Sequence, residues 1–203
     1  MALLSGSGKN GAKRGVAKFT DDYVIEDYTD AKGREKERAV YIGPRIPIRE
    51  DIKSLRLKLA GVLVLAFITV ALILCCHLIN HTTAWWLGTV IPLGAALFPA
   101  MFLLFSLPNL PFKGGAMQRD GYMHGIIRLF NCFGAIAVIM AVELVFEIIY
   151  RFTKNDWLFV SGDVAFVVLV VLTILISVAA IVILRSIDVD ETELGVERIQ
   201  KNS

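Results

Sequence analysis

The sequence predicts an all-α membrane protein: a four-transmembrane-helix bundle with a short cytoplasmic N-terminal β-hairpin and a juxtamembrane amphipathic helix. Three observations predict this class. Lys, Arg, Asp and Glu are absent from the 54 residues 59–112 and from the 21 residues 164–184. Hydrophobic residues make up 56% of the 203 residues, above the roughly 45–50% usual for soluble domains. Apolar stretches of about 18 residues or more are typical of membrane spans, which excludes soluble globular, disordered and nucleic-acid-binding classes.

The segment before the first span predicts a tail and a hairpin. Residues 1–22 are basic and rich in glycine, which predicts a disordered tail. Residues 23–47 contain two runs rich in β-forming residues, 23–25 and 39–42, on either side of the turn-like run 30–33. A two-stranded hairpin alone is marginally stable in water. We therefore expect it to lean on the membrane, on loops or on another chain.

The residues that follow predict an amphipathic helix leading into the first span. Apolar side chains recur at intervals of four, three and four residues from Ile48 to Leu59. Basic side chains fall mostly on the other side: Arg49, Lys53, Arg56 and Lys58. One interpretation is that these residues bind anionic lipid headgroups, and the other is that they are ordinary positive flanking charges. Both interpretations place the segment in the cytoplasm.

The membrane domain is predicted to cover residues 48–184. Trp85 and Trp86 follow the short turn 80–83 and suit the headgroup level of an aromatic belt. The second span contains Pro92 and Pro99, and each removes a backbone donor and favours a kink. The four predicted spans are about 59–79, 84–107, 126–149 and 164–184.

The distribution of Lys and Arg predicts the orientation. Five basic residues lie in 45–58, none in 80–84, three in 108–128 and two in 150–163. We therefore expect a multi-pass protein of the cell membrane with both termini in the cytoplasm. The C-terminal segment 185–203 is then an acidic cytoplasmic tail.

Glu143 and Glu147 interrupt the third span and share one helix face, being four residues apart. A charged side chain at the centre of a membrane helix costs about 2.5–3.5 kcal/mol on insertion scales, so such a residue indicates a functional site. His77 and His81, also four apart, lie at a similar depth at the end of the first span. If the first and third spans touch, the four side chains form one polar intramembrane cluster. Such a cluster would bind a metal, help the helices to associate, or carry protons or substrate. The alternative is that the four are unrelated interfacial residues.

Two further patterns predict helix packing and helix ends. Small or weakly polar residues on the fourth span, Thr173, Ser177 and Ala180, let helix backbones approach closely in lipid. A stripe on the third span joins both glutamates to Cys132, Ile136 and Met140. Arg151 and Lys154 follow Glu147 closely enough to pair with it, which favours an interfacial position for that glutamate. Residues 161–163 (Ser-Gly-Asp) offer N-capping chemistry for the fourth span.

The sequence favours a non-enzymatic accessory or scaffold subunit of a membrane complex, since no catalytic array or nucleotide-binding motif is present. The alternative is a small homo-oligomeric transporter or channel with Glu143 as the proton- or cation-coupling carboxylate. A third class is a membrane metalloenzyme that uses His77, His81 and both glutamates. We expect no cofactor, no metal and no nucleic acid. The expected partners are the lipid bilayer, anionic lipid headgroups, and a partner membrane protein or further copies of the chain.

Overall fold

The computed structural model describes five stretches of the chain: residues 23–29, 33–43, 45–112, 114–154 and 160–189. The predicted tail 1–22 and most of the predicted tail 185–203 lie outside the described residues. The chain divides into two compact units, Met1–Pro44 and Arg45–Ser203.

The first unit contains a two-stranded antiparallel sheet. Strand β1 (Tyr23–Thr29) pairs with β2 (Glu35–Tyr41) in a register that runs from Tyr23 opposite Tyr41 to Thr29 opposite Glu35. Gly33, in the connection, has φ +73°, a left-handed conformation that glycine adopts without steric cost. Val24 and Ile25 on β1 are exposed, so the sheet presents apolar side chains on its surface.

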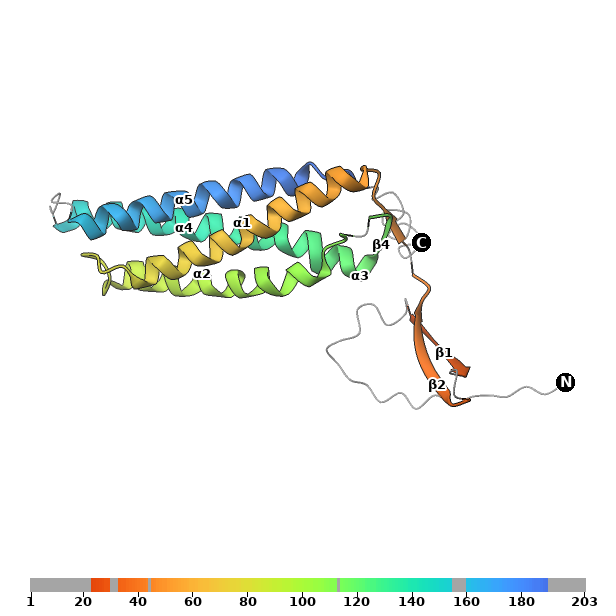
Figure 1. The fold of residues 1–203 in the computed structure, drawn as a ribbon. Coiled ribbons are helices and arrows are strands. Elements are labelled where there is room, and N and C mark those ends of the chain that lie inside the picture. The colour runs from red at the N-terminus through yellow and green to blue at the C-terminus, as the bar shows by residue number, and fades with distance from the viewer. Residues whose placement is uncertain (1–22, 30–32, 44, 113, 155–159, 190–203) are drawn as a thin grey trace, which may run out of the picture. The chain divides into compact units, whose positions relative to one another are not determined.

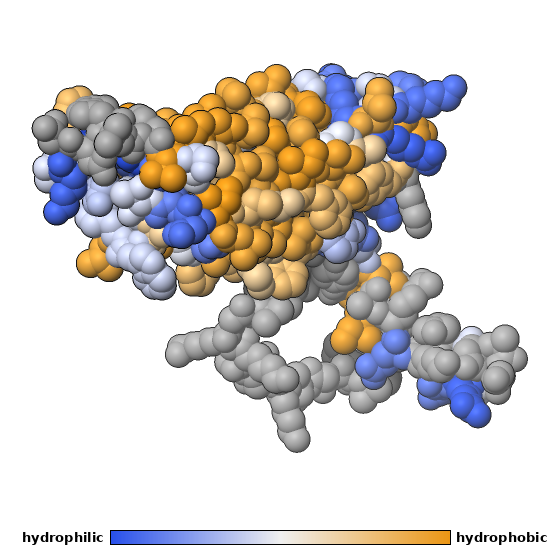
Figure 2. All heavy atoms as spheres, turned by 60° about the vertical axis from the view of Figure 1, so that its left-hand side comes forward, coloured by the Kyte–Doolittle hydropathy of each residue, from blue (hydrophilic) through white to orange (hydrophobic). Residues whose placement is uncertain are grey.

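The second unit is built on four long helices that lie side by side (Figure 1). These are α1 (Ile52–Leu78), α2 (Leu87–Ser106), α4 (Arg128–Lys154) and α5 (Ser161–Arg185). Each belongs to a helical stretch long and apolar enough to cross a membrane. Figure 2 shows an apolar band between hydrophilic ends on the visible face of this unit. The prediction of four helices long and apolar enough to span a membrane is confirmed.

A regular spacing of buried residues explains how the helices pack. The buried residues of α5 run from Asp163 to Leu184 at alternating intervals of three and four, and those of α1 do the same from Leu55 to Cys76. This 3.5-residue repeat keeps one seam facing the neighbouring helices, as in left-handed bundles. Helix α1 packs on α2 and α5, and α4 packs on α2 and α5. The first and third spans therefore occupy opposite corners of the bundle.

Short elements close one end of this unit. Strand β3 (Arg45–Pro47) pairs with β4 (Ala116–Gln118), and Ile48 forms a bridge with Val189 beyond α5. The connection from α2 to α4 passes through η2 (Leu107–Asn109), β4, α3 (Arg119–Tyr122) and the π-helical turn η3 (Met123–Ile127). These pairings join the start of α1, the α2–α4 connection and the end of α5.

Two predicted boundaries are corrected by the structure. Helix α1 begins at Ile52 and not at Ile48, because the Ile48 amide donates to the Gly115 carbonyl at 3.2 Å. The Asp51 carboxylate caps the helix by accepting from the Lys53 amide at 3.1 Å. The predicted loop 150–163 is shorter, since α4 continues to Lys154 and includes Arg151.

The two prolines of the second span lie inside α2, which remains helical through both of them. Pro92 is buried in the bundle. Each proline lacks the backbone donor for the carbonyl four residues earlier, which weakens the helix locally.

Candidate functional site

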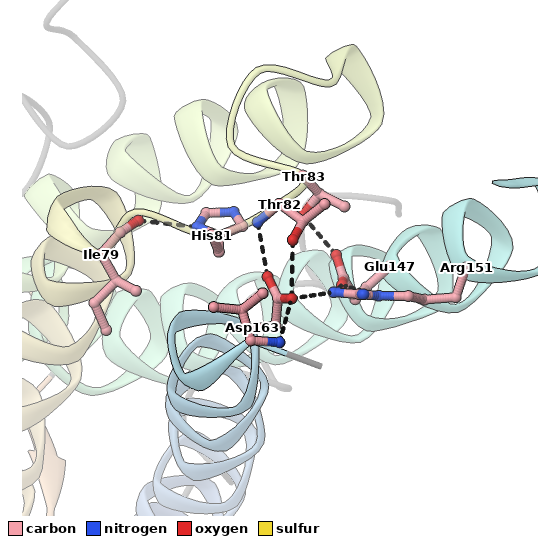
Figure 3. Close-up of polar contacts among 8 residues, drawn as sticks. Ile79, His81, Thr82, Thr83, Glu147, Arg151 and Asp163 are labelled. Carbon is pink, nitrogen blue, oxygen red and sulfur yellow. Dashed lines mark hydrogen bonds and ion pairs between the residues drawn. The ribbon is translucent and has the colours of Figure 1, made fainter. Parts of the chain in front are cut away.

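A buried network of charged and hydroxyl side chains lies at the end of the bundle opposite β3 and β4. Its centre is Arg151 on α4, whose exposed fraction is 1%. The guanidinium donates to Glu147 Oε1 from Nε at 3.0 Å and from a terminal nitrogen at 2.9 Å. A terminal nitrogen also lies 2.9 Å from Asp163 Oδ2. Figure 3 shows Arg151 extended between the two carboxylates.

Asp163 links the start of α5 to the turn between α1 and α2. Its Oδ1 accepts from the Thr82 amide at 2.7 Å, and its Oδ2 accepts from the Thr82 hydroxyl at 2.9 Å. Oδ2 also accepts from the Val160 amide at 3.1 Å, so the carboxylate satisfies a donor at the helix N-terminus. The predicted capping role of residues 161–163 is therefore carried by Asp163.

Gly162 permits this close approach. A Cβ atom at position 162 would lie 2.2 Å from the backbone carbonyl oxygen of Asn80. Only a residue without a side chain lets the α1–α2 turn come so near to the start of α5. This glycine is therefore needed to hold Thr82 and Asp163 together.

Glu147 completes the network on the other side of Arg151. Its Oε2 accepts from the buried Thr83 hydroxyl at 2.6 Å, as Figure 3 shows. The predicted pairing of Arg151 with Glu147 is confirmed. Because one guanidinium bonds two carboxylates, and both carboxylates bond the α1–α2 turn, the network ties the end of α4 and the start of α5 to a turn that is distant in the sequence. Charged groups that satisfy one another in this way are tolerated inside a protein, while a lone buried charge is not.

The two histidines lie apart from this network. His77 is exposed, and its Nδ1 donates to the Ile73 carbonyl at 2.8 Å within its own helix. His81 is buried, and its Nδ1 donates to the Ile79 carbonyl at 2.9 Å. The His81 ring stacks on Phe166 with 3.9 Å between ring centroids. Within the described stretches, no hydrogen bond or ion pair joins either histidine to Glu143 or Glu147.

Glu143 is also outside the network, one helical turn before Glu147. Its side chain is fully buried, and neither carboxylate oxygen has a hydrogen-bond partner among the described residues. The Thr89 hydroxyl on α2 and the Cys76 thiol on α1 lie close enough to interact with it. The structure thus does not join His77, His81, Glu143 and Glu147 into one cluster: only Glu147 enters the network.

No group of three or more His, Cys, Asp or Glu side chains in the described part of the chain has an arrangement that would hold a metal ion.

The basic residues proposed as headgroup ligands lie at the other end of the bundle, where they also make bonds within the chain. Arg56 Nε donates to the Phe112 carbonyl at 2.9 Å. Lys58 Nζ donates to the Ser186 carbonyl at 2.7 Å and pairs with Glu50. Partial burial acts to raise the pKa of Glu50, but hydrogen bonds from Lys58 and Ser54 lower it below its usual value. Of the other two, Lys53 is exposed and Arg49 donates its backbone amide to the Asp188 carbonyl.

Sequence reasoning anticipated part of the network. The Glu147–Arg151 spacing and the capping by Asp163 could be predicted, but the contacts of Asp163 with Thr82 and Arg151 and of Glu147 with Thr83 could not. Threonines in a tight turn and an aspartate at the start of a helix are both common at helix ends that face water.

Compared with models of protein families, with curated proteins and with solved structures, the chain matches none of them.

Proposed function

We propose that this chain is a non-enzymatic accessory or scaffold subunit of a membrane complex, with the four-helix bundle as its anchor. The observation that carries the proposal is the β1–β2 unit. It forms a compact unit separate from the bundle, and its sheet has two strands in the described part of the chain. Both strands are therefore edges, with backbone groups able to pair with another chain.

The exposed apolar side chains of this unit support binding of a partner protein. Ile25 is 68% exposed, and Val24 and Ile42 are exposed as well. A two-stranded sheet gains little stability by itself, so a surface that covers these residues would stabilise it. Addition of a strand at an exposed edge is a recurring mode of protein recognition, in which backbone hydrogen bonds supply affinity.

The bundle supports the proposal by its internal pairing of charge. The charged side chains of the network are engaged in contacts that hold the helices together, so they are not available to bind a substrate: Glu147, Arg151 and Asp163. Two basic residues, Arg151 and Lys154, lie in the predicted loop 150–163 and count against this orientation, but Arg151 is buried in the polar network. We propose that the β1–β2 unit and the C-terminus lie in the cytoplasm and that the chain is a multi-pass protein of the cell membrane, as the distribution of Lys and Arg predicts.

Replacement of Ile25 by lysine is expected to abolish co-purification of the partner protein from mild detergent. A lysine at position 25 replaces an exposed apolar side chain by a charge and so removes the apolar contact with the partner. The matched control is Thr29→Lys on the same strand, where the new charge lies opposite Glu35 and favours the sheet. The measurement is the amount of each co-purified protein relative to the bundle.

The proposal requires the two variants to differ. Equal recovery of every co-purified protein with Ile25→Lys and Thr29→Lys would contradict a role for the hairpin surface. The thermal midpoint of the bundle should be the same in both variants, because neither substitution lies in the membrane domain.

Glu143 favours a second candidate function, a small homo-oligomeric transporter or channel. A buried carboxyl group without a hydrogen-bond partner among the described residues is unfavourable in hydrocarbon as an anion. It must therefore carry a proton or hold a cation, which are the states that a coupling carboxylate alternates between. Pro92 and Pro99 in α2, the helix that carries the neighbouring Thr89, weaken the backbone and would ease such a change.

Flux into liposomes separates the two candidates. The scaffold function predicts that proton and cation flux of the purified chain equals that of protein-free liposomes, with and without Glu143→Gln. The transporter function predicts flux above that background in the parent chain and a fall of about tenfold or more in Glu143→Gln, as expected when a proton-transfer group is lost. Ser177→Ala, on α5, is the control for a buried polar change in the bundle.

A further inference from the structure

A hollow opens between the start of α4 and the residues that follow α5. Its volume is about 270 Å³, and its walls are mostly apolar. Ile126, Ile127 and Phe130 form one side, while Ile187 and Val189 form the other. The volume is slightly below the roughly 300–1,000 Å³ of sites for drug-sized ligands, which suits a segment of a flexible chain better than a whole rigid molecule.

One positive charge lies at the rim of this hollow. Arg185 is the last residue of α5, and its guanidinium carbon lies 5.3 Å from the centre of the Phe130 ring. Arg185 is exposed, and it has no carboxylate partner among the described residues. Its charge is therefore available to an anion, unlike that of Lys58, which pairs with Glu50.

The backbone beside the hollow is unusual. Met123–Ile127 makes a π-helical turn, a rare form that often occurs at functional sites. The turn is held close to its neighbours, since a Cβ at Gly125 would lie 2.8 Å from the Asn109 carbonyl oxygen. Ile126 and Ile127, both in this turn, line the hollow. Its shape thus depends on a local departure from regular helix.

We propose that this hollow is a binding site for one membrane lipid with an anionic headgroup. Part of an acyl chain lies against Ile127 and Phe130, and the headgroup phosphate pairs with Arg185. Arginine is well suited to this contact because its planar guanidinium forms two parallel hydrogen bonds with phosphate oxygens.

The position of the site favours a lipid over a free anion. Arg185 is the last residue of a helix that is apolar enough to span the membrane. The end of such a helix is the level at which lipid headgroups lie. A free phosphate would gain nothing from the apolar walls, whereas a lipid meets both the charge and the hollow. Anionic lipids are also attracted to basic residues near a membrane surface.

Native mass spectrometry of the purified full chain in mild detergent tests the site, with phosphatidylglycerol and phosphatidylcholine of the same acyl chains as probes. The parent is expected to bind phosphatidylglycerol about fivefold more tightly, roughly the factor that one arginine contributes near an anionic surface. Arg185→Gln should remove this preference. Arg45→Gln on β3, which removes an exposed arginine at the same end of the bundle, should leave it unchanged.

The acyl-chain contact has its own variant. Ile127→Trp fills the hollow and should weaken binding of both lipids, while Arg185→Gln affects only the anionic one. If Ile127→Trp lowers the thermal midpoint of the bundle, the comparison of Arg185→Gln with Arg45→Gln decides whether the site binds the lipid.

Three results would overturn the proposal. Equal binding of both lipids by the parent would exclude recognition of the headgroup charge. An equal loss in Arg45→Gln and Arg185→Gln would indicate diffuse attraction to the surface. Displacement of phosphatidylglycerol by inorganic phosphate would indicate a site for free anions.

Discussion

Methionine in place of Arg151 is expected to lower the free energy of unfolding of the bundle by about 3–5 kcal/mol, the usual cost of removing one partner from a buried ion pair. The substitution leaves Glu147 and Asp163 buried with no cation between them. Both carboxylates keep their contacts with Thr82 and Thr83. They therefore stay close together although their negative charges now repel each other. The link from α4 to the start of α5 is lost.

The matched control is Lys154→Met, which removes one positive charge from an exposed position on the same helix. Its effect should lie within about 0.5 kcal/mol, as is usual for surface positions. The measurement is the unfolding midpoint in mixed micelles as denaturing detergent is titrated. Equal midpoints for the two variants would show that the Arg151 contacts contribute nothing to stability. Glu147→Leu combined with Arg151→Met should recover part of the loss, because it removes one of the two unpaired carboxylates.

Replacement of Glu143 by methionine is expected to have the opposite effect on stability. It should raise the free energy of unfolding by about 1–3 kcal/mol, the usual cost of a buried polar group without a partner. The side chain is fully buried and its carboxylate oxygens have no hydrogen-bond partner among the described residues. Methionine has a similar length and a flexible shape, so it can fill the same space beside Thr89 and Cys76.

Val142→Met is the control for this prediction, since Val142 is the preceding residue and faces away from the bundle. It should change the midpoint by less than about 0.5 kcal/mol. A lower midpoint for Glu143→Met than for the parent would show that Glu143 stabilises the bundle. If Glu143→Met is more stable, the parent carries a destabilising carboxyl group, which is expected where function requires it.

The four long apolar helices could be predicted from the sequence because the pattern that indicates them is local. A stretch of about 20 residues without a charged side chain has few structural interpretations other than a membrane span. The buried stripe of Cys132, Ile136, Met140, Glu143 and Glu147 was likewise visible, and the structure confirms it. A helical repeat fixes which side chains share a face before any neighbour is known.

The polar network could be predicted only in part because it depends on helix arrangement. Glu147 and Arg151 are four residues apart on one helix, so their pairing follows from local geometry. Asp163 and Thr82 are 81 residues apart. Nothing in the sequence shows that the α1–α2 turn meets the start of α5, because that contact depends on the order of helices around the bundle.

The same limit applies to the proposed cluster of histidines and glutamates. It required contact between the first and third spans, but α1 and α4 stand at opposite corners. His77 is exposed at one end of α1, while His81 stacks on Phe166 of α5. Equal depth along two helices does not bring side chains together unless the helices are neighbours and the faces are turned toward each other.

Site-specific photocrosslinking in intact cells tests the scaffold function most directly. A photoreactive amino acid at position 25, on the exposed face of β1, should form an adduct with one other protein species. The same group at position 154, exposed at the other end of the bundle from β3 and β4, should not. Absence of a protein adduct from positions 24 and 25, in cells where the chain is in the membrane, would contradict the proposal that the β1–β2 unit binds a partner.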